Sequence, residues 1–273
     1  MLTKGEKGIL FLLDCCNGQI SKLRLVKLLF LISKRIALYD FMPYKYGPFS
    51  FQLYHDLSRL ERDEFVSTDD NSVFLANRDL PKIDSKVKNI IRMNSQRFAT
   101  LDDGMLLDHI YEKYPEYTIF SLYRRTMEYE RDSAGITTIG YEGKSIDRFL
   151  LTLVENKIGK LIDVRKNPFS MNYGYTKSQL EKELKSLGIS YIHLPELGID
   201  SDQRQNLSER GFVELFQRYA MELGAKEDLL DTIKSLAQKE KVALMCFEAK
   251  ESDCHRGVIA KRFRDEGLDV VAL

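Results

Sequence analysis

The second half of the chain alternates short apolar runs with amphipathic segments, and this alternation restricts the fold more than any other feature. The runs are rich in β-branched residues, and segments of helical periodicity lie between them. They span residues 136–139, 161–164, 189–194, 242–247 and 270–273. Strands that alternate with helices form a mostly parallel sheet with helices on both faces. The sequence therefore predicts an α/β domain over residues 133–273.

The first eighty residues show a different pattern, in which apolar residues mostly repeat at helical spacing. Two amphipathic segments precede a Gly-Pro turn, and a third helix is expected over about residues 50–62. Two apolar runs then flank Asp69-Asp70-Asn71, which predicts a hairpin. Three helices followed by a hairpin is the order of a winged helix-turn-helix. We expect an α-rich, winged helix-turn-helix-like domain over residues 1–80 and a helical bridging segment over 81–132.

Composition excludes several classes of protein. The 41 basic residues equal the 41 acidic residues, so the chain is not a nucleic-acid coat that is basic overall. The apolar runs, such as residues 28–32, are too short to span a bilayer, and the first twenty residues lack a signal-peptide pattern. Four cysteines, two of them adjacent, fit a reduced chain better than a disulfide scaffold. We expect a cytoplasmic protein that has no membrane partner.

A basic segment coincides with the second predicted helix. Five of the nine basic residues among the first sixty lie there, and no acidic residue separates them. They are Lys22, Arg24, Lys27, Lys34 and Arg35. A basic helix within a winged-helix pattern favours contacts with duplex phosphates. We therefore expect nucleic acid, and DNA in particular, as a partner; because many winged helices bind proteins, a protein partner is the alternative.

Polar and aromatic side chains follow the predicted strands where each strand ends. In an open parallel sheet, ligands bind beyond the carboxyl ends of the strands. The residues expected to bind substrate there are Tyr141, Asp163, Arg165, Asn167, Tyr173, Tyr175, His193, Glu196 and Arg256. Arg165 and Arg256 would clamp a phosphate or carboxylate, with Asp163 orienting Arg165. Tyr173 or Tyr175 would stack on a base.

Cys254-His255-Arg256 opens the last predicted helix. A helix N-terminus favours an anion and lowers the pKa of a cysteine placed there. Glu248 follows a strand predicted to be buried and could act as a general acid or base, or pair with Arg256 or Arg165. We expect Glu248, Cys254 and His255 to be the catalytic residues; the alternative is that Cys254 only packs and His255 only caps its helix.

Zinc is a further possibility at these residues, because Cys246 and Cys254 with His255 or His193 supply its usual ligand types. Seven residues separate the two cysteines, and no second cysteine pair accompanies them. This spacing does not match a common zinc motif. We therefore expect no metal and no other cofactor.

Five motifs, in order, make residues 137–273 resemble the family called domain of unknown function 488. They are Thr138-Ile139-Gly140-Tyr141, Asp163-Val164-Arg165 with Pro168, His193-Leu194-Pro195-Glu196-Leu197-Gly198, Cys246-Phe247-Glu248 and Cys254-His255-Arg256. Many members have histidine where this chain has Tyr141. Lys27-Leu28-Leu29 and the segment 46–50 are similar to the winged-helix-like region that precedes this domain in a longer subfamily, and more loosely to the Panacea-type antitoxin domain.

The resemblance implies an α/β fold and a pocket around Arg165, Glu248, Cys254, His255 and Arg256, but it implies no particular reaction. Some members occur alongside DNA-repair or defence functions. Together with the basic segment, this favours a nucleic-acid-processing enzyme of hydrolase or glycosylase type, which would take a flipped or terminal nucleotide into its pocket. One alternative is a non-catalytic regulator that binds DNA or a partner and senses a small anion. The other is a transferase that depends on Cys254.

Overall fold

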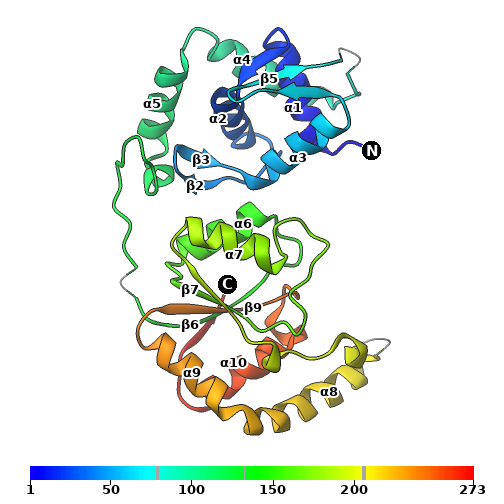
Figure 1. The fold of residues 1–273 in the computed structure, drawn as a ribbon, viewed down its shortest axis with the longest axis vertical. Helices are drawn as coiled ribbons and strands as arrows, with labels where there is room; N and C mark the ends of the chain where they lie inside the picture. Colours follow the sequence, from blue (N-terminus) through cyan, green and yellow to red (C-terminus); the bar gives the residue numbers. More distant parts are fainter. Residues whose placement is uncertain (78–79, 132, 205–206) are drawn as a thin grey trace. The chain divides into compact units, whose positions relative to one another are not determined.

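The computed structural model describes residues 1–77, 80–131, 133–204 and 207–273. The chain divides into two compact units, Met1–Tyr129 and Glu130–Leu273 (Figure 1). In the described residues no helix combines the length and the apolar character that a bilayer crossing requires.

The amino-terminal unit is rich in helices and contains two small antiparallel sheets. Its elements are α1 (Lys4–Cys15), β1 (Gln19–Ser21), α2 (Lys22–Ser33), β2 (Met42–Tyr44), β3 (Gly47–Phe49), α3 (Phe51–Arg62), β4 (Val66–Thr68), β5 (Ser72–Leu75), α4 (Ser85–Arg97), α5 (Asp103–Lys113) and the 3-10 turn η1 (Pro115–Thr118). Strands β1, β5 and β4 form one sheet in that order, and β2 pairs with β3. The winged-helix assignment of this unit stays a prediction.

Polar caps and apolar faces explain why these helices form where they do. Thr3 and Glu6 make a capping box at the start of α1, and Ser21 and Ser50 cap α2 and α3. Helices α4 and α5 bury their apolar residues in the same core as α1 and α2. The segment expected to act as a bridge therefore supplies two core helices, because its apolar stripes need a surface to cover.

The carboxy-terminal unit is a five-stranded parallel sheet with helices on both faces, as predicted. Its elements are β6 (Gly135–Gly140), α6 (Ile146–Glu155), β7 (Lys160–Asp163), α7 (Lys177–Ser186), β8 (Ser190–His193), η2 (Pro195–Leu197), η3 (Ser201–Arg204), α8 (Glu209–Glu222), η4 (Leu223–Lys226), α9 (Glu227–Ala237), β9 (Lys241–Cys246), η5 (Glu251–Asp253), α10 (His255–Asp265) and β10 (Val270–Ala272).

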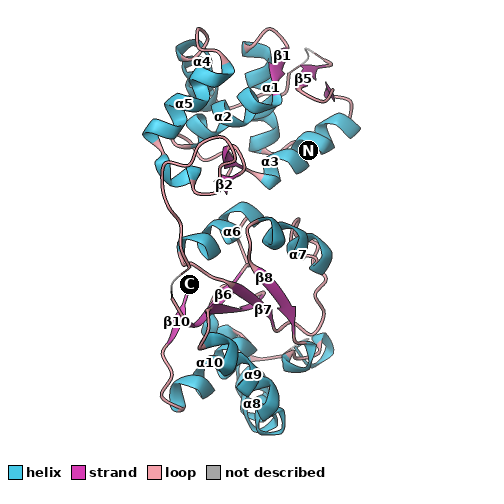
Figure 2. Ribbon diagram, turned by 60° about the vertical axis from the view of Figure 1, so that its left-hand side comes forward, coloured by secondary structure: helices cyan, strands magenta, loops and turns pink. Residues whose placement is uncertain are grey.

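The strand order is β10-β6-β9-β7-β8, so β9 is central. Helices α6 and α7 cover one face of the sheet, while α8, α9 and α10 cover the other (Figures 1 and 2). The residues of β9 after Lys241 are buried, because helices cover both of its faces and strands flank both of its edges. The turn that follows Cys246 therefore begins at the end of a buried central strand, which fixes its starting point.

Candidate functional site

Three neighbouring strands end at one edge of the sheet and place their following residues together. Gly140 at the end of β6 is in register with Cys246 of β9, and Asp163 of β7 is in register with Met245. A Cβ on Gly140 would lie only 1.9 Å from the carbonyl oxygen of Glu248. Because only glycine permits this approach, Gly140 lets the turn after β9 pack directly on β6.

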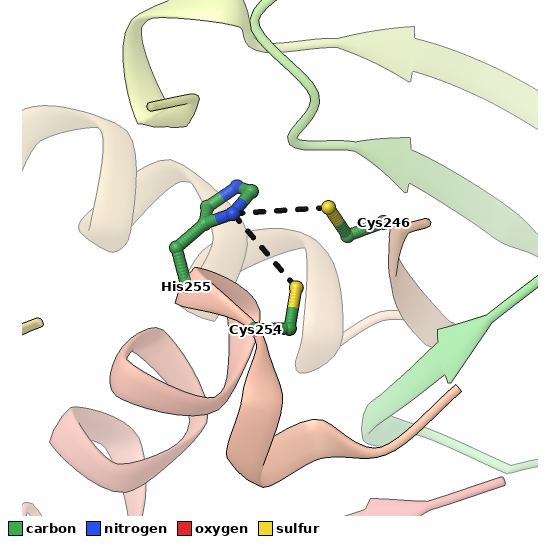
Figure 3. A group of neighbouring side chains, drawn as sticks. All are labelled: Cys246, Cys254 and His255. Atoms are coloured by element: carbon green, nitrogen blue, oxygen red, sulfur yellow. Dashed lines mark hydrogen bonds between the residues drawn. The ribbon is translucent and has the colours of Figure 1, made fainter. Parts of the chain in front are cut away.

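The side chains of Cys246, Cys254 and His255 point toward one another beyond this edge (Figure 3). His255 Nδ1 lies 3.7 Å from Cys246 Sγ and 3.8 Å from Cys254 Sγ. All three side chains are buried. Cys246 ends β9, Cys254 is the N-cap residue of α10 and His255 is its first residue. The turn between β9 and α10 therefore brings two thiols and an imidazole into one cluster.

The imidazole of His255 is held in a fixed orientation. Its Nε2 lies 2.9 Å from the carbonyl oxygen of Val164, which can only accept a hydrogen bond. Nε2 must therefore carry a proton, and Nδ1 faces the two sulfur atoms. The Tyr219 ring meets the imidazole edge to face, with 5.7 Å between ring centroids, and its hydroxyl donates to Leu197 O.

The two thiols differ in acidity. Burial raises the pKa of Cys254, but hydrogen bonds from Cys246 and His255 outweigh burial and lower that pKa to about 6. The hydrogen bond to Cys254, together with burial, raises the pKa of Cys246 well above its ordinary value. Cys254 is therefore the more acidic thiol of the pair.

Glu248 stands beside this cluster as an ionised carboxylate. Burial raises the pKa of Glu248. Hydrogen bonds from the Cys254 thiol, from its own backbone N–H and from Cys246 outweigh burial, and the charge of Arg204 helps them lower the pKa below its ordinary value. Its Oε1 accepts from Arg204 Nη1 at 3.1 Å. Its Oε2 is buried and has no hydrogen-bond partner among the described residues. The carboxylate pairs with neither Arg256 nor Arg165, and its lowered pKa keeps it ionised, so it is not a general acid.

Arg165 is buried and bonded to groups of this chain. Its Nε and Nη2 donate to Asp163 at 2.9 and 2.7 Å, and its Nη1 donates to the Tyr141 hydroxyl and the Tyr175 carbonyl at 3.0 Å each. Burial lowers the pKa of Arg165, but hydrogen bonding and charge pairing with Asp163 more than offset this and raise it. Asp163 therefore holds the Arg165 guanidinium in a network of hydrogen bonds to groups of this chain.

Arg256 is 1% exposed and holds the turn that carries Glu248. Its Nη1 donates to the Glu248 carbonyl at 2.6 Å, and its Nη2 donates to the Ala249 carbonyl at 3.0 Å. Both guanidiniums of the predicted clamp are buried and bond to groups of this chain, so the clamp on an anion stays a prediction. The sequence placed both residues at the right edge but could not show these partners.

The remaining expected substrate-binding residues fall into two groups. Tyr141 and Tyr175 are buried and stacked, with 4.2 Å between ring centroids, and His193 Nε2 lies 2.8 Å from the Arg165 carbonyl oxygen. These three residues surround Arg165. The others lie in loops on the outer side of this edge: Asn167 and Glu196 are exposed and Tyr173 is half-buried.

An open cavity of about 470 Å³ leads to the cysteine cluster. It lies between α8, η5 and the start of α10, and Cys254 contributes to its wall. Val213, Phe216 and Val258 make much of that wall apolar. No sequence pattern indicates this cavity or the contact of Arg204 with Glu248, since both depend on how α8 and η3 pack against the sheet.

Two of the basic residues expected to bind nucleic acid are engaged within the amino-terminal unit. Lys27 is 3% exposed, and its Nζ donates to the carbonyls of Tyr46 and Pro48. Burial lowers the pKa of Lys27 to about 7. Arg24 pairs with Asp103 at 3.0 Å. Lys27 therefore does not reach the surface, contrary to the prediction.

The other three basic residues are more accessible. Lys34 and Arg35 are exposed, and Lys22 is half-buried. The Lys34 ammonium lies 4.8 Å from the ring centroid of Tyr117 and 3.2 Å from its hydroxyl. Phosphate contacts from α2 would thus have to come mainly from its C-terminal end.

Fold and site together define an α/β unit with a parallel sheet and a cysteine–histidine cluster where its central strand ends. Residues 145–263 match the model of the family described as Domain of unknown function DUF488. The match runs from α6 through most of α10 and includes Cys246, Glu248, Cys254 and His255. Comparison with curated proteins gave no match.

Proposed function

We propose that the carboxy-terminal unit is a cysteine-dependent transferase whose nucleophile is Cys254. The supporting observation is a pair of contacts of one imidazole. His255 Nδ1 faces the Cys254 sulfur at 3.8 Å, and His255 Nε2 donates to the Val164 carbonyl oxygen at 2.9 Å. A nucleophile beside a base that a third group orients is the usual arrangement of an activated thiol. The N-terminus of α10 adds a favourable field for a negative sulfur.

The reaction follows from the cavity and the thiolate. A substrate with an apolar portion occupies the wall between α8 and α10, with an electrophilic carbon next to Cys254 Sγ. His255 Nδ1 first accepts the proton of the Cys254 thiol. The sulfur–carbon bond then forms while the bond to the leaving group breaks, and the leaving group departs with the electron pair and takes this proton from Nδ1. An acceptor nucleophile then removes the group and restores the thiolate. A reducing cytoplasmic location would keep all four cysteines free, as they are here.

Alkylation of the full chain by iodoacetamide at pH 7, with a chelator present, tests the nucleophile. We expect Cys254 to be labelled several-fold faster than Cys15 and Cys16, because burial raises the pKa of both of those thiols. Peptide mass spectrometry measures the three rates within one sample. The His255→Ala variant should lose the advantage of Cys254, whereas His109→Ala in the other unit should keep it. Labelling confined to Cys15 and Cys16, or an unchanged Cys254 rate in His255→Ala, would contradict the proposal.

A second candidate function is duplex DNA binding by the amino-terminal unit. The order of elements favours it, because α1, β1, α2 and α3 precede the β4–β5 hairpin and β1 joins that hairpin in one sheet. Helix-turn-helix proteins with such a hairpin place basic residues on duplex phosphates. Here the exposed Lys34 and Arg35 are the residues best placed for phosphate contacts.

We expect the full chain to bind duplex oligonucleotides with an affinity that falls as salt rises. The variant Lys34→Glu/Arg35→Glu should weaken binding and reduce the slope of log K against log salt by about 2, as expected for two lost phosphate contacts. Fluorescence anisotropy measures both quantities, with the surface variant Arg210→Glu/Arg218→Glu as control. Binding that the Lys34/Arg35 variant leaves unchanged would exclude this surface. Tight binding without turnover would favour the regulator alternative.

A further inference from the structure

We infer that Cys246, Cys254, His255 and Glu248 form a binding site for a divalent metal ion of zinc-like chemistry. The ligand atoms of the two cysteines and the histidine all lie within 4.8 Å of one another. A tetrahedral zinc site with ordinary bond lengths separates a sulfur and a nitrogen ligand by about 3.6 Å. The separations here are 3.7 and 3.8 Å. The side chains therefore already have the spacing that such an ion requires.

The orientation of His255 supports the same conclusion. A histidine that binds a metal usually donates its other ring N–H to a carbonyl or carboxylate, which fixes the tautomer. His255 Nε2 makes this contact with Val164 O, so its Nδ1 can present a lone pair to the ion. The Tyr219 ring and the surrounding core restrict rotation of the imidazole.

Glu248 lies outside this group of three ligand atoms and is the candidate for a fourth ligand. Its Oε2 is a buried polar atom that no group among the described residues satisfies, which is uncommon in a folded protein. Arg204 Nη1 donates to the other carboxylate oxygen, Oε1, at 3.1 Å. Arg256 and the close approach at Gly140 fix the backbone of the same turn. The two sulfurs and the nitrogen leave one position of a tetrahedral site, which this oxygen would fill.

The chemistry of the set selects the ion. Two thiolates and an imidazole favour zinc and other late transition metals over magnesium or calcium, which prefer oxygen ligands. The seven residues between the cysteines are no obstacle, because the turn and η5 return the chain from the end of β9 to the start of α10. This inference does not depend on the proposed transferase activity, although a bound ion would keep Cys254 deprotonated.

Cobalt titration of the chelator-treated full chain tests the site. We expect one equivalent of Co²⁺ to give a thiolate-to-cobalt charge-transfer band and tetrahedral ligand-field bands, both abolished when Zn²⁺ displaces the cobalt. Cys246→Ser and His255→Ala should weaken binding at least about 100-fold, and Glu248→Gln about 10- to 100-fold. The variants Cys15→Ser/Cys16→Ser and Glu240→Gln are the matched controls and should bind as the parent does.

Thermal unfolding gives a second measurement of metal binding that does not depend on the absorption bands of cobalt. Zn²⁺ should raise the Tm of the parent chain but not that of Cys246→Ser, and Mg²⁺ should shift neither. A parent chain that gives no charge-transfer band and no Zn²⁺-dependent Tm shift would overturn the inference, as would bands that survive in Cys246→Ser. Such a failure is separable from failure of the transferase proposal, because the alkylation of Cys254 is measured with a chelator present.

Discussion

Replacing Asp163 by alanine is expected to lower the free energy of unfolding of the carboxy-terminal unit by about 3–5 kcal/mol, as removal of one partner from a buried ion pair does. Asp163 is fully buried and accepts hydrogen bonds from the Arg165 guanidinium and the Tyr191 hydroxyl. Its loss leaves the Arg165 charge buried among Tyr141 and Tyr175 without a counter-ion. A guanidinium cannot relieve this by losing its proton, so the folded state bears the whole cost.

Urea unfolding followed by far-UV circular dichroism measures this effect. Removing both charges in Asp163→Ala/Arg165→Met should restore much of the lost stability, because no unpaired charge then remains inside. The exposed Asp200→Ala is the matched control and should change stability little. A double variant as unstable as Asp163→Ala alone would show that the cost lies in lost packing rather than in the unpaired charge.

The same pair illustrates how far the sequence could predict the site. The alternation of strands and helices predicted the parallel sheet, and the carboxyl-edge rule placed Asp163, Arg165 and Cys254 near one another. The carboxyl-edge rule could not indicate that groups of this chain would accept the hydrogen bonds of Arg165. One of these acceptors, the Tyr175 carbonyl, lies in a loop of irregular structure. For Arg256 the partners are the backbone carbonyls of residues 248 and 249, whose positions no side-chain pattern encodes.

The zinc-type cluster was discounted for a related reason. Common zinc motifs hold their cysteines on one tight turn, whereas Cys246 and Cys254 belong to a strand end and a helix start. Their proximity arises from the return of the chain through η5, which sequence spacing does not express. The sequence predicts a reactive Glu248. It does not show that Arg204 donates to Oε1 while Oε2 has no hydrogen-bond partner among the described residues.

Helix α2 shows a different error, in which the basic residues were interpreted without regard to the apolar residues beside them. Its basic residues were assigned to the surface, yet the segment from Leu25 to Ile32 is buried throughout. A helix that is apolar on nearly every side lies inside a domain. The apolar residues beside Lys27 thus carried the information that this lysine is internal, and α4 and α5 are among the elements that cover it.

Stability that rises with pH is the expected consequence of burying Lys27. In the folded chain, burial lowers the pKa of Lys27 from 10.5 to about 7. A neutral amine has two N–H groups, and the Tyr46 and Pro48 carbonyls accept two hydrogen bonds from this nitrogen. Between pH 7 and 10.5 the unfolded chain therefore binds one proton more than the folded chain, so the free energy of unfolding increases with pH in this window.

The increase due to Lys27 alone amounts to about 5 kcal/mol at most across the whole window. Lys27→Met lacks this increase, so the parent should gain stability relative to the variant from pH 7 to 10, as measured by urea unfolding at each pH. Lys45→Met removes an exposed lysine nearby and should run parallel to the parent. Parallel profiles for Lys27→Met would mean that the lysine stays charged and that its carbonyl contacts offset its burial. A neutral internal amine also predicts that Lys27→Met leaves the salt dependence of duplex binding unchanged, because no phosphate contact is lost.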